Sequence, residues 1–536
     1  MSMGRASGVA LIGTEGHMIE VEADISQTLP AFVLLGLPDA SLKESQDRIR
    51  SAANNTGLAL PPRKLTINLL PAPLRKSGSS LDLAILMSAW AADGHVTGTD
   101  GIVFLAELGL DGRLRPVRGV LPAVASAVKT GFSRVVVSRG NAAEAALVPG
   151  AEILAGDHVA EVADAFRSAT WKPLPGGTPE PLDHQWGGSS STQVTERLAD
   201  RAPGEETAGA DAGSPALPDL AEVHGQYEAR FALEAAAAGG HHLLLVGPPG
   251  AGKTMMAERL PSILPPLDEE AAMEVTAIAS ITANAKTVTA LQRTPPFESP
   301  HHSASSAAIV GGGSRVAAPG AVTRAHRGVL FLDEAPEHSR QVLDSLRQPL
   351  ESGHVSLHRS AGSVSYPARF QLVMAANPCL CGMNTGAGTQ CTCTVLQRRT
   401  YLSRISGPLL DRIDCQVQVE RPRSVSQSLE SSGEPSSAVL QRVMRARAAQ
   451  RERLAPWGLE MNSQVSLKLL SHGLRLPKES TGLLDEALDR ADLSLRGYVR
   501  VLRLAWTISD ITGEDRPGEE HIDAAMQLRQ QLGGPA

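Results

Sequence analysis

The feature that most constrains this chain is the run HLLLVGPPGAGKTMMAERL, which starts at His242. An apolar strand, the pattern G-x-x-x-x-G-K-[ST] and a helix follow one another in it without a gap. Glycines allow the backbone to turn tightly, so that successive amides and the amino terminus of the helix point at bound phosphates. A Gly-rich turn that binds nothing is the alternative, but both flanking elements are those that a phosphate site requires. The predicted cofactor-binding residues are Gly247, Pro248, Pro249, Gly250, Ala251, Gly252, Lys253 and Thr254.

Two carboxylates follow a second strongly apolar run, GVLFLDE. The run is typical of a buried strand in the sheet that carries the phosphate loop. We expect Thr254 and Asp333 to hold Mg²⁺ beside the phosphates that Lys253 contacts. Glu334 is then suited to polarise the attacking water. Two acids after a strand often form only a turn or a helix cap, and it is the phosphate loop upstream that favours ATP hydrolysis with Mg²⁺.

A third apolar run, FQLVMAANP, ends in Asn377. An uncharged amide at the end of a strand in the same sheet is suited to orient a water molecule near the γ-phosphate. The alternative is that Asn377 only caps the strand before Pro378. We therefore add Asn377 to Lys253 and Glu334 as a candidate catalytic residue.

Two arginines complete the candidate catalytic set. Arg412 stands between two aspartates in SGPLLDRIDCQVQV, just before a predicted strand, where its guanidinium can reach the phosphate of a neighbouring subunit. A surface ion pair with those aspartates is the alternative. Arg496 lies on a predicted helix with Arg500 and Arg503, three or four residues apart and therefore on one face. We expect Arg496 to sense the phosphate within its own subunit, and a solvated basic face is the alternative.

The chain of 536 residues is too long for one hydrophobic core, because single cores stop growing near roughly 250 to 300 residues. Apolar runs alternate with helical patterns in its first part, which indicates a mixed α/β domain. Two stretches rich in Pro, Gly, Ser or acidic residues bury too little apolar surface to form a core, and we interpret them as linkers. The expected divisions are an α/β domain at 1–172, a flexible linker at 173–217, an α/β ATPase core at 218–420, a Ser-rich linker at 421–437 and a helical lid at 438–536.

Composition and charge narrow the class of protein. Hydrophobic residues make up 42% of the chain and the formal net charge is -7, which suits a globular protein and provides no whole-molecule basic field for nucleic acid. The amino terminus lacks an apolar signal core, and no stretch approaches the roughly 18 apolar residues that a membrane span needs. We expect a cytoplasmic protein with no membrane partner, in which any contact with DNA is local.

Four of the five cysteines crowd into one short stretch, at Cys379, Cys381, Cys391 and Cys393. Two C-x-C pairs separated by nine residues can fold together, and four thiolates suit a tetrahedral Zn²⁺ site of the structural type. Reduced free thiols and disulfides are the alternatives, although a cytoplasm disfavours disulfides. The lone Cys415 is expected to be a small buried side chain.

The pattern extends beyond a general phosphate site in the segments PHHSASSAAIVGGGS, AHRGVLFLDEAPE, LRQPLESGHVSLHRS, YPARFQLVMAANPCLCG and RISGPLLDRID. Outside the linkers the chain closely resembles the YifB/ComM family of magnesium-chelatase-like AAA+ ATPases. The resemblance implies a homohexameric ring related to the chelatase and MCM helicase motors, which in ComM members drives branch migration of DNA during natural transformation. The sequence departs from the family at Glu298, where an arginine is usual. By motif, the resemblance supports the roles given above to Lys253, Thr254, Asp333, Glu334, Asn377, Arg412 and Arg496.

The amino-terminal domain resembles the Lon-protease-like fold found in the same family. Ser80 in RKSGSSLDLAI falls where a Lon-type nucleophile lies, but the position of its lysine partner holds Leu121. A serine needs a base to be activated. We therefore expect no protease activity and interpret Ser80 as the cap of a helix that begins near Leu81, because serine can bond the free amides there.

Two segments are candidate insertions in the ATPase core. One is the Gly-rich stretch from His301 to Gly320, and the other, ESGHVSLHRSAGSVSYPARF, alternates around a Gly-Ser turn and predicts a β-hairpin. By resemblance to related ring motors both would line the central pore, where His358 and Arg359 from all subunits make a locally positive channel. Solvated loops without a ligand are the alternative.

Three functions remain open at this point. The first is a ring motor that moves branched or single-stranded DNA through backbone contacts, because aromatic residues at 3% are too few for extended base stacking. The second is a chelatase-type motor that remodels a protein partner, and the third is a regulatory ATP-binding module with little turnover. We favour the first, acting in homologous recombination during competence.

Overall fold

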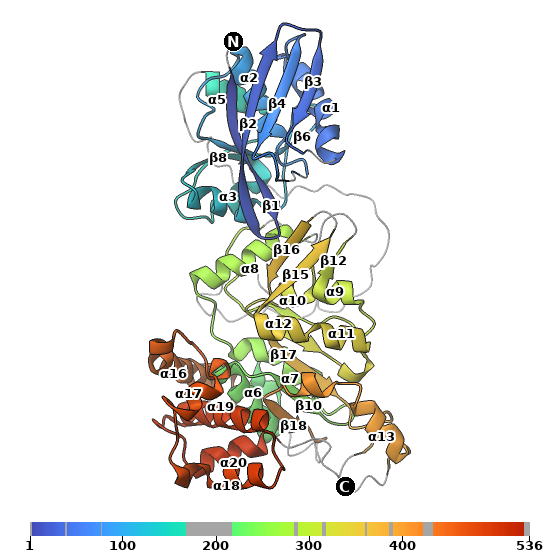
Figure 1. The fold of residues 1–536 in the computed structure, drawn as a ribbon, viewed down its shortest axis with the longest axis vertical. Helices are drawn as coiled ribbons and strands as arrows, with labels where there is room; N and C mark the ends of the chain where they lie inside the picture. Colours follow the sequence, from blue (N-terminus) through green and yellow to red (C-terminus); the bar gives the residue numbers. More distant parts are fainter. Residues whose placement is uncertain are drawn as a thin grey trace, which may run out of the picture.

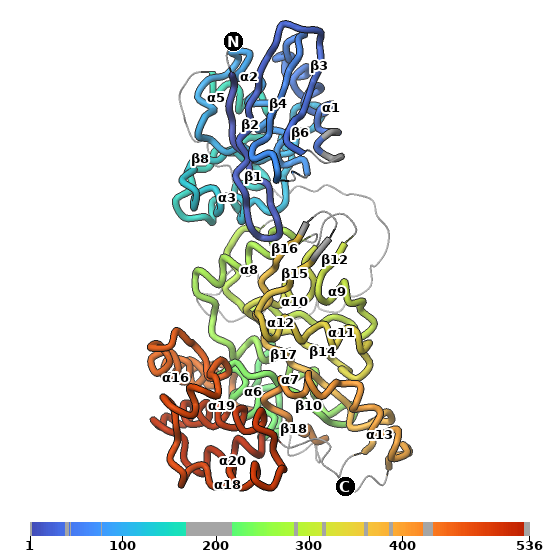
Figure 2. Tube along the Cα trace, in the orientation of Figure 1, coloured from blue at the N-terminus to red at the C-terminus, as the bar shows by residue number. Residues whose placement is uncertain are grey.

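The computed structural model describes residues 3–37, 40–74, 76, 78–167, 217–282, 288–313, 318–359, 362–384, 390–421 and 433–529. Along the chain these residues form an amino-terminal α/β domain, a second α/β domain and a set of carboxyl-terminal helices (Figures 1 and 2). The mixed α/β architecture with parallel strands is therefore confirmed, whereas the likeness of the amino-terminal domain to Lon proteases stays a prediction. Most of the two predicted linkers lies outside the described residues.

The amino-terminal domain is built on a seven-stranded mixed sheet in the order β3-β4-β2-β1-β5-β8-β9. β2 pairs antiparallel with β1 and β4, and the other neighbours are parallel. Alternate residues of a strand face opposite sides, as in β4, where Leu65, Ile67 and Leu69 are buried. The strands are β1 (Gly4–Ile12), β2 (Glu15–Ser26), β3 (Ala31–Leu35), β4 (Lys64–Leu70), β5 (Val103–Leu105), β8 (Arg134–Ser138) and β9 (Glu152–Gly156), and a separate pair is β6 (Glu107–Leu108) with β7 (Leu114–Arg115).

Helices cover both faces of this sheet. One apolar core joins the sheet to α1, α2 and α5, and a second core joins its other face to α3 and α4. Successive side chains of one strand face different cores. In β5, Phe104 belongs to the first core, and its neighbours Val103 and Leu105 belong to the second. The sheet is therefore the middle of three layers. The helices are α1 (Ala40–Asn55), α2 (Asp82–Asp93), α3 (Val120–Lys129), α4 (Ala142–Ala145) and α5 (Val159–Arg167).

The start of α2 corrects the interpretation of Ser80. The helix begins at Asp82, its capping position is Leu81, and no side chain bonds its free amides. The backbone N–H of Asp82 donates instead to the carbonyl of Ser79, so a backbone turn satisfies that donor. The prediction that Ser80 caps this helix is therefore wrong. Leu121, which occupies the position of the Lon-type lysine, is fully buried in α3.

The second domain contains a five-stranded parallel sheet in the order β11-β14-β17-β10-β18. The strand before the phosphate loop, β10, therefore neighbours β17, and β17 separates it from β14. All residues of these three strands are buried, because apolar layers cover both faces of the sheet. The strands are β10 (Leu243–Val246), β11 (Phe297–Glu298), β14 (Val329–Leu332), β17 (Gln371–Ala376) and β18 (Cys415–Gln418).

Two apolar cores flank this sheet, and one of them includes the carboxyl-terminal helices. Leu245 and Phe331 face a core shared with α6, α7, α16, α19 and α20. Leu244 and Leu332 face a core shared with α9, α10 and α11. The helices are α6 (Tyr227–Gly239), α7 (Lys253–Arg259), α8 (Glu269–Ile281), α9 (Ser306–Val310), α10 (Ala321–Arg324), α11 (Arg340–Ser345), α12 (Arg347–Ser352), α13 (Val395–Leu402), α14 (Gly407–Leu410), α16 (Ser436–Leu454), α17 (Leu467–Ser471), α18 (Lys478–Asp489), α19 (Leu495–Thr512) and α20 (Glu519–Gln527).

The two predicted insertions lie next to each other (Figure 1). The first contains α9 and the paired strands β12 (Gly311–Gly312) and β13 (Ala318–Pro319), and the second is the hairpin of β15 (His354–Arg359) and β16 (Gly362–Pro367). A Cβ added at Gly311 would lie 3.0 Å from Leu357, which places β12 against β15. The hairpin itself was predicted.

The predicted Gly-Ser turn of that hairpin is wrong. Gly362 pairs with Arg359 and Ser363 pairs with His358, so both residues of the expected turn belong to β16. The period of alternation shows that two strands are present but does not locate the residue at which the chain reverses. The side chains of His358 and Arg359 lie outside the described part of the structure.

The amino-terminal domain contacts the second domain through α3 and through the turn between β1 and β2. The backbone N–H of Gly119, before α3, donates to the carbonyl of Ser280 in α8 over 3.1 Å. Gly13, in the turn between β1 and β2, lies against Val364 and Ser365 of β16. The hairpin β15–β16 therefore touches both β12 and the amino-terminal domain.

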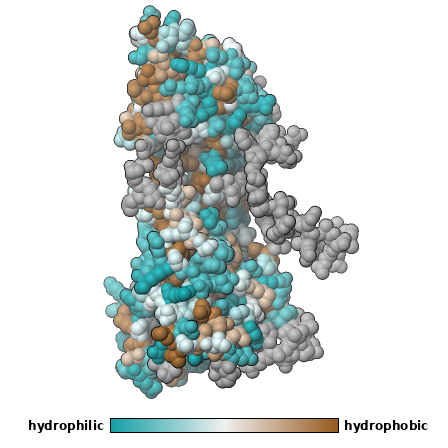
Figure 3. All heavy atoms as spheres, turned by 90° about the vertical axis from the view of Figure 1, so that its right-hand side faces the viewer, coloured by the Kyte–Doolittle hydropathy of each residue, from teal (hydrophilic) through white to brown (hydrophobic). Residues whose placement is uncertain are grey.

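Hydrophilic residues cover most of the face shown in Figure 3, where hydrophobic residues gather in small separate patches. Among the residues that the structure describes, no helix combines the length and the apolar character that crossing a bilayer requires.

Candidate nucleotide site

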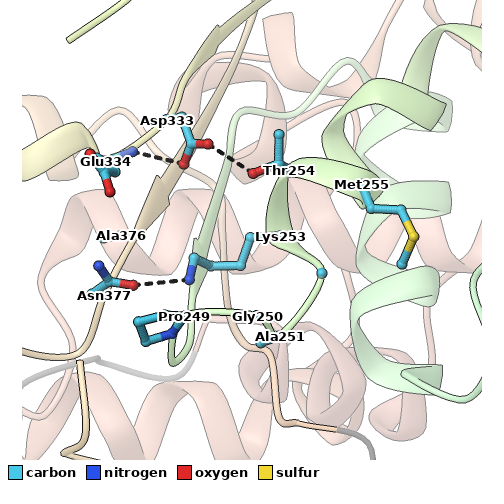
Figure 4. Close-up of a pocket in the computed structure, with 11 residues that line it drawn as sticks. Pro249, Gly250, Ala251, Lys253, Thr254, Met255, Asp333, Glu334, Ala376 and Asn377 are labelled. Atoms are coloured by element: carbon cyan, nitrogen blue, oxygen red, sulfur yellow. Dashed lines mark hydrogen bonds between the residues drawn. The ribbon is translucent and has the colours of Figure 1, made fainter. Parts of the chain in front are cut away.

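Residues of three separate motifs meet at one edge of the parallel sheet (Figure 4). The carboxyl ends of β10, β14 and β17 lie side by side, because Val246 pairs with Ala376 and Leu332 pairs with Met374. A cavity of about 460 Å³ opens there. It is lined by Pro249, Gly250, Ala251, Gly252, Lys253, Thr254, Met255, Asp333, Glu334, Ala376 and Asn377.

The ammonium group of Lys253 lies inside the curve of the phosphate loop. Its Nζ donates to the carbonyl of Gly247 at 2.6 Å, to the carbonyl of Pro248 at 3.1 Å and to Oδ1 of Asn377 at 3.1 Å. Burial lowers the pKa of Lys253, and the two carboxylates of the cavity oppose that shift. A bound phosphate would replace these neutral oxygens as the acceptor of the hydrogen bonds from Lys253. It would also place a full negative charge beside the ammonium group.

Thr254 and Asp333 form a pair of oxygen donors suited to Mg²⁺. Oγ1 of Thr254 donates to Oδ2 of Asp333 at 2.8 Å, and Oδ1 of Asp333 accepts from the backbone N–H of Glu334 at 2.9 Å. Mg²⁺ binds one or two protein oxygens together with phosphate and water oxygens. The donor set at this edge therefore fits Mg²⁺ held with a nucleotide.

Glu334 has a backbone conformation that residues other than glycine rarely adopt. Its φ of 48° and ψ of 46° are left-handed, at the point where the chain leaves β14. Such conformations concentrate at functional sites, because the surrounding structure must hold them in place. The side chain is 51% exposed, and its Oε2 lies 3.5 Å from Nδ1 of His302. The carboxylate is therefore open to water at the rim of the cavity.

Two further residues at this edge escaped the sequence interpretation. His302 contacts Glu334, and its ring is tilted against that of His301 with 4.1 Å between the centroids. The adjacent histidines were visible in the sequence but were assigned to an insertion. Arg421 donates from Nε and Nη2 to the carbonyl of Pro249 at 3.1 and 2.9 Å. No local pattern marks Arg421, because only the fold brings it to the loop.

Three family models match consecutive parts of the chain. They are described as magnesium chelatase, subunit ChlI (residues 219–427), subunit ChlI of Mg-chelatase (residues 21–141) and magnesium chelatase, subunit ChlI C-terminal (residues 433–529). The chain is 38% identical to the protein YifB of Escherichia coli over 99% of its own length and 97% of that protein. It is 35% identical to the competence protein ComM of Haemophilus influenzae over 99% and 98% of the two chains. The chain belongs to the YifB/ComM family of magnesium-chelatase-like AAA+ ATPases.

A third relative, the uncharacterised protein Rv2897c of Mycobacterium tuberculosis, is 44% identical over 99% of both chains. Membership of the YifB/ComM family indicates an AAA+ ATPase that uses ATP and Mg²⁺. The cavity at the phosphate loop agrees with that chemistry, since it combines a cation, a hydroxyl and carboxylates at one sheet edge.

Glu298, expected from the resemblance to depart from the family, forms an ion pair within its own chain. Glu298 ends the edge strand β11, and its Oε2 accepts from Nε of Arg324 at 2.9 Å. The carboxylate is thus paired within its own chain and is not among the residues that line the cavity. An arginine at this position would place a second positive charge beside Arg324, and the two would repel each other. Glu298 and Arg324 carry opposite charges and attract each other.

Arg412 and Arg496 lie away from the cavity of their own chain. Both are held near the amino end of β18, whereas the phosphate loop follows the carboxyl end of the parallel strand β10. Four residues of strand separate these ends, which corresponds to about 13 Å. Arg412 bonds Glu351 rather than either flanking aspartate, and Nη1 of Arg496 donates to Asp411 at 2.9 Å. This placement does not fit the expected role of Arg496 within its own subunit.

Of the three arginines on this face of α19, Arg496 is 72% exposed, whereas Arg500 and Arg503 make contacts within the chain. Nε of Arg503 donates to the carbonyl of Val465 at 2.7 Å, and Arg500 pairs with the buried Asp414. Burial favours the neutral acid, but contact with His241 and the charge of Arg500 outweigh it and lower the pKa of Asp414 well below its usual range. The pair of Arg500 and Asp414 attaches α19 to the segment that precedes β18.

The four clustered cysteines come together beside the nucleotide site. Their Sγ atoms all lie within 4.8 Å of one another. The separation is 3.4 Å between Cys379 and Cys381, and Cys391 lies 3.7 Å from each of these two sulfurs. All four are free thiols. Cys415 is a separate, fully buried side chain in β18, as predicted.

Proposed function

We propose that this chain is an ATP-hydrolysing ring motor that moves branched DNA. The observation that carries the proposal is the meeting of Lys253, Thr254, Asp333 and Asn377 at one sheet edge. In this proposal Lys253 contacts the phosphates, and Thr254 and Asp333 hold Mg²⁺. Glu334 polarises the attacking water and Asn377 orients it. The open carboxylate of Glu334 supports its role, because water reaches it directly.

The position of the two arginines supports assembly into a ring. Arg412 and Arg496 lie at the end of the sheet opposite to the phosphate loop of their own chain, so neither completes that site. We propose a homohexamer in which Arg412 of one subunit reaches the nucleotide of the next, as arginine fingers do. Arg496 belongs to the same surface, because it is bonded to Asp411, next to Arg412 in the chain.

The two adjacent hairpins support DNA as the substrate. β12–β13 and β15–β16 pack together, and copies of them in a ring would surround one axis. The net charge of -7 leaves local basic groups such as Arg359 as the means of contact. The relative in Haemophilus influenzae is named a competence protein, which agrees with DNA branch migration in homologous recombination. Contact with the phosphate backbone would be insensitive to sequence.

ATP hydrolysis measured with four kinds of DNA tests this proposal. The purified chain is assayed with no DNA, single-stranded DNA, duplex DNA and a four-way junction, at low and at moderate salt. Stimulation by DNA, greatest for the junction and reduced by salt, is expected because phosphate contacts release counterions. If the chain hydrolyses ATP but neither binds any of these DNAs nor is stimulated by them, the ATPase part of the proposal stands. DNA is then excluded as the substrate.

The family models favour a second candidate function. All three are described by a chelatase subunit, and a chelatase-type motor that remodels a protein partner would use the same nucleotide site. Stimulation by a protein partner in the absence of DNA distinguishes this function from the first.

A further inference from the structure

We infer that Cys379, Cys381, Cys391 and Cys393 hold one zinc ion, and that this ion fixes the positions of Asn377 and the phosphate loop. The first half of this inference stands on the cysteine geometry alone. The second half rests on the proposed function, because it takes the phosphate loop as the nucleotide site.

The spacing of the sulfur atoms fits a single tetrahedral ion. With Zn–S bonds of about 2.3 Å, the sulfurs of a tetrahedral site lie about 3.8 Å apart. The measured separations are 3.4 Å between Cys379 and Cys381 and 3.7 Å from Cys391 to each of them, and the fourth sulfur lies within 4.8 Å of all three. A disulfide requires about 2.05 Å between its sulfurs, so the four thiols are not arranged as two bonded pairs.

The surroundings of the sulfurs favour a closed structural site. Cys379 is fully buried and Cys393 is 9% exposed. The backbone N–H of Cys381 donates to Sγ of Cys393 at 3.4 Å, which is the kind of contact that orients a metal-bound sulfur. Four thiolates leave no open position on a tetrahedral zinc ion, so the ion would stabilise the fold and take no part in catalysis.

The cluster is attached directly to the end of β17. Asn377, which accepts the hydrogen bond from Lys253, is separated from Cys379 only by Pro378. The first C-x-C pair then turns, and the backbone N–H of Gly382 donates to the carbonyl of Cys379 at 3.0 Å. A metal bound to Cys379 therefore restrains the backbone next to Asn377.

The same turn packs against the phosphate loop. A Cβ added at Gly382 would lie 2.5 Å from Cδ and 2.8 Å from Cγ of Pro249, and Gly382 has a φ of +74°. Only glycine allows the turn to lie this close to the proline ring. Pro249 is also held by Arg421, through its carbonyl oxygen. The cysteine turn and Arg421 thus both contact Pro249 of the phosphate loop.

The second C-x-C pair extends the restraint to α13. Cys393 is followed by Thr394, which caps that helix, with Gln397 completing a capping box. One ion shared by the two pairs would therefore fasten the end of β17 to the start of α13. The same two segments also meet where Nη1 of Arg398 in α13 donates to Oδ1 of Asn384 at 3.1 Å.

Metal analysis of the full chain, purified without chelator, tests the site. We expect one zinc per chain, and replacement of the zinc by Co²⁺ should give the visible and sulfur-to-metal absorption of a tetrahedral four-thiolate site. The double variant Cys391→Ser/Cys393→Ser should lose the metal, whereas Cys415→Ala should keep it. Iron in place of zinc, or a parent chain with no metal and four titratable thiols, would overturn the inference. The Co²⁺ spectrum of the parent decides the matter even if the double variant does not fold.

Nucleotide binding by two glycine variants tests the link to the phosphate loop. Gly382→Ala should keep its zinc but bind ATP at least about ten-fold more weakly, because its new methyl group displaces Pro249. Gly458→Ala is the matched control, since Gly458 also has a positive φ, of +65°, but a Cβ there meets nothing within 4 Å. Parental affinity in Gly382→Ala would show that the cysteine turn does not position the loop. Neither readout involves DNA, so failure of the DNA proposal would leave both results interpretable.

Discussion

Nζ of Lys253 donates to Oδ1 of Asn377 over 3.1 Å, although the two residues are 124 positions apart in the chain. The contact joins the phosphate loop to the end of β17, the strand that lies between β10, which precedes the loop, and β14, which precedes the two acidic residues. It places an amide within reach of any phosphate that Lys253 binds. The order of the strands, rather than the order of the motifs, therefore sets the geometry of the site.

Lys253→Ala should weaken nucleotide binding by roughly ten- to a hundredfold, because charge-assisted hydrogen bonds contribute about 1.5–3 kcal/mol. Asn377→Ala removes a neutral group and should reduce turnover more than affinity. Binding of a fluorescent nucleotide, together with the rate of phosphate release, separates the two effects. Unchanged affinity in Lys253→Ala would contradict its assignment to the phosphates.

Glu334→Gln should bind nucleotide with near-parental affinity and hydrolyse it roughly 10² to 10⁴ times more slowly, because only the ionised carboxylate acts as a base towards water. The amide has almost the same size, so the unusual backbone at this position is retained. Single-turnover hydrolysis measures the chemical step. A parental rate would show that another group activates the water.

Arg412→Ala should bind nucleotide normally and lose turnover by roughly 10³ to 10⁵, the contribution of an arginine finger. Mixing this variant with Glu334→Gln should restore part of the activity, since some interfaces then combine an intact Arg412 with an intact Glu334. Arg490→Ala removes an exposed arginine that pairs with Glu486 of α18 and serves as the control. Mixtures no more active than their separate components would argue against action across an interface.

Arg359→Ala should reduce DNA-stimulated hydrolysis and junction movement while basal hydrolysis stays at the parental rate. The backbone of Arg359 belongs to β15, which is not among the elements that line the nucleotide cavity. Binding of a labelled four-way junction as a function of salt should show a shallower slope in the variant, because fewer counterions are released. An identical slope and identical stimulation would remove Arg359 from the DNA contact.

The stability of the second domain should fall as the pH drops from about 6.5 towards 4, in part through His242. Nδ1 of His242 accepts from the backbone N–H of Leu372 at 3.0 Å, and burial lowers the pKa of His242 to about 4. Between these pH values the unfolded chain binds a proton at His242 that the folded chain does not, so acid favours unfolding.

The contribution of this one group approaches about 1.4 kcal/mol per pH unit within that window. His242→Asn keeps an acceptor for the same amide but does not titrate, so its free energy of unfolding should depend less on pH. Thermal or urea unfolding at several pH values measures the difference. Parallel curves for the variant and the parent would exclude His242 as the source.

The sequence alone determined those features of this protein that depend only on neighbouring residues. The strand, loop and helix around Lys253, the two acids after β14 and the paired cysteines are local patterns, because each depends on spacings of a few residues that the chain itself imposes. A β-hairpin at β15–β16 was predictable for the same reason, since alternation is a property of neighbouring side chains.

The tertiary structure decided what local spacing cannot carry. It placed β17 between β10 and β14, brought His302 to Glu334, and held Arg496 at the sheet end opposite to its own phosphate loop. It also set the start of α2 at Asp82, two residues after Ser80. Each of these outcomes depends on which strands pair and which apolar faces pack together. Those choices minimise the free energy of the whole domain, so no short segment contains them.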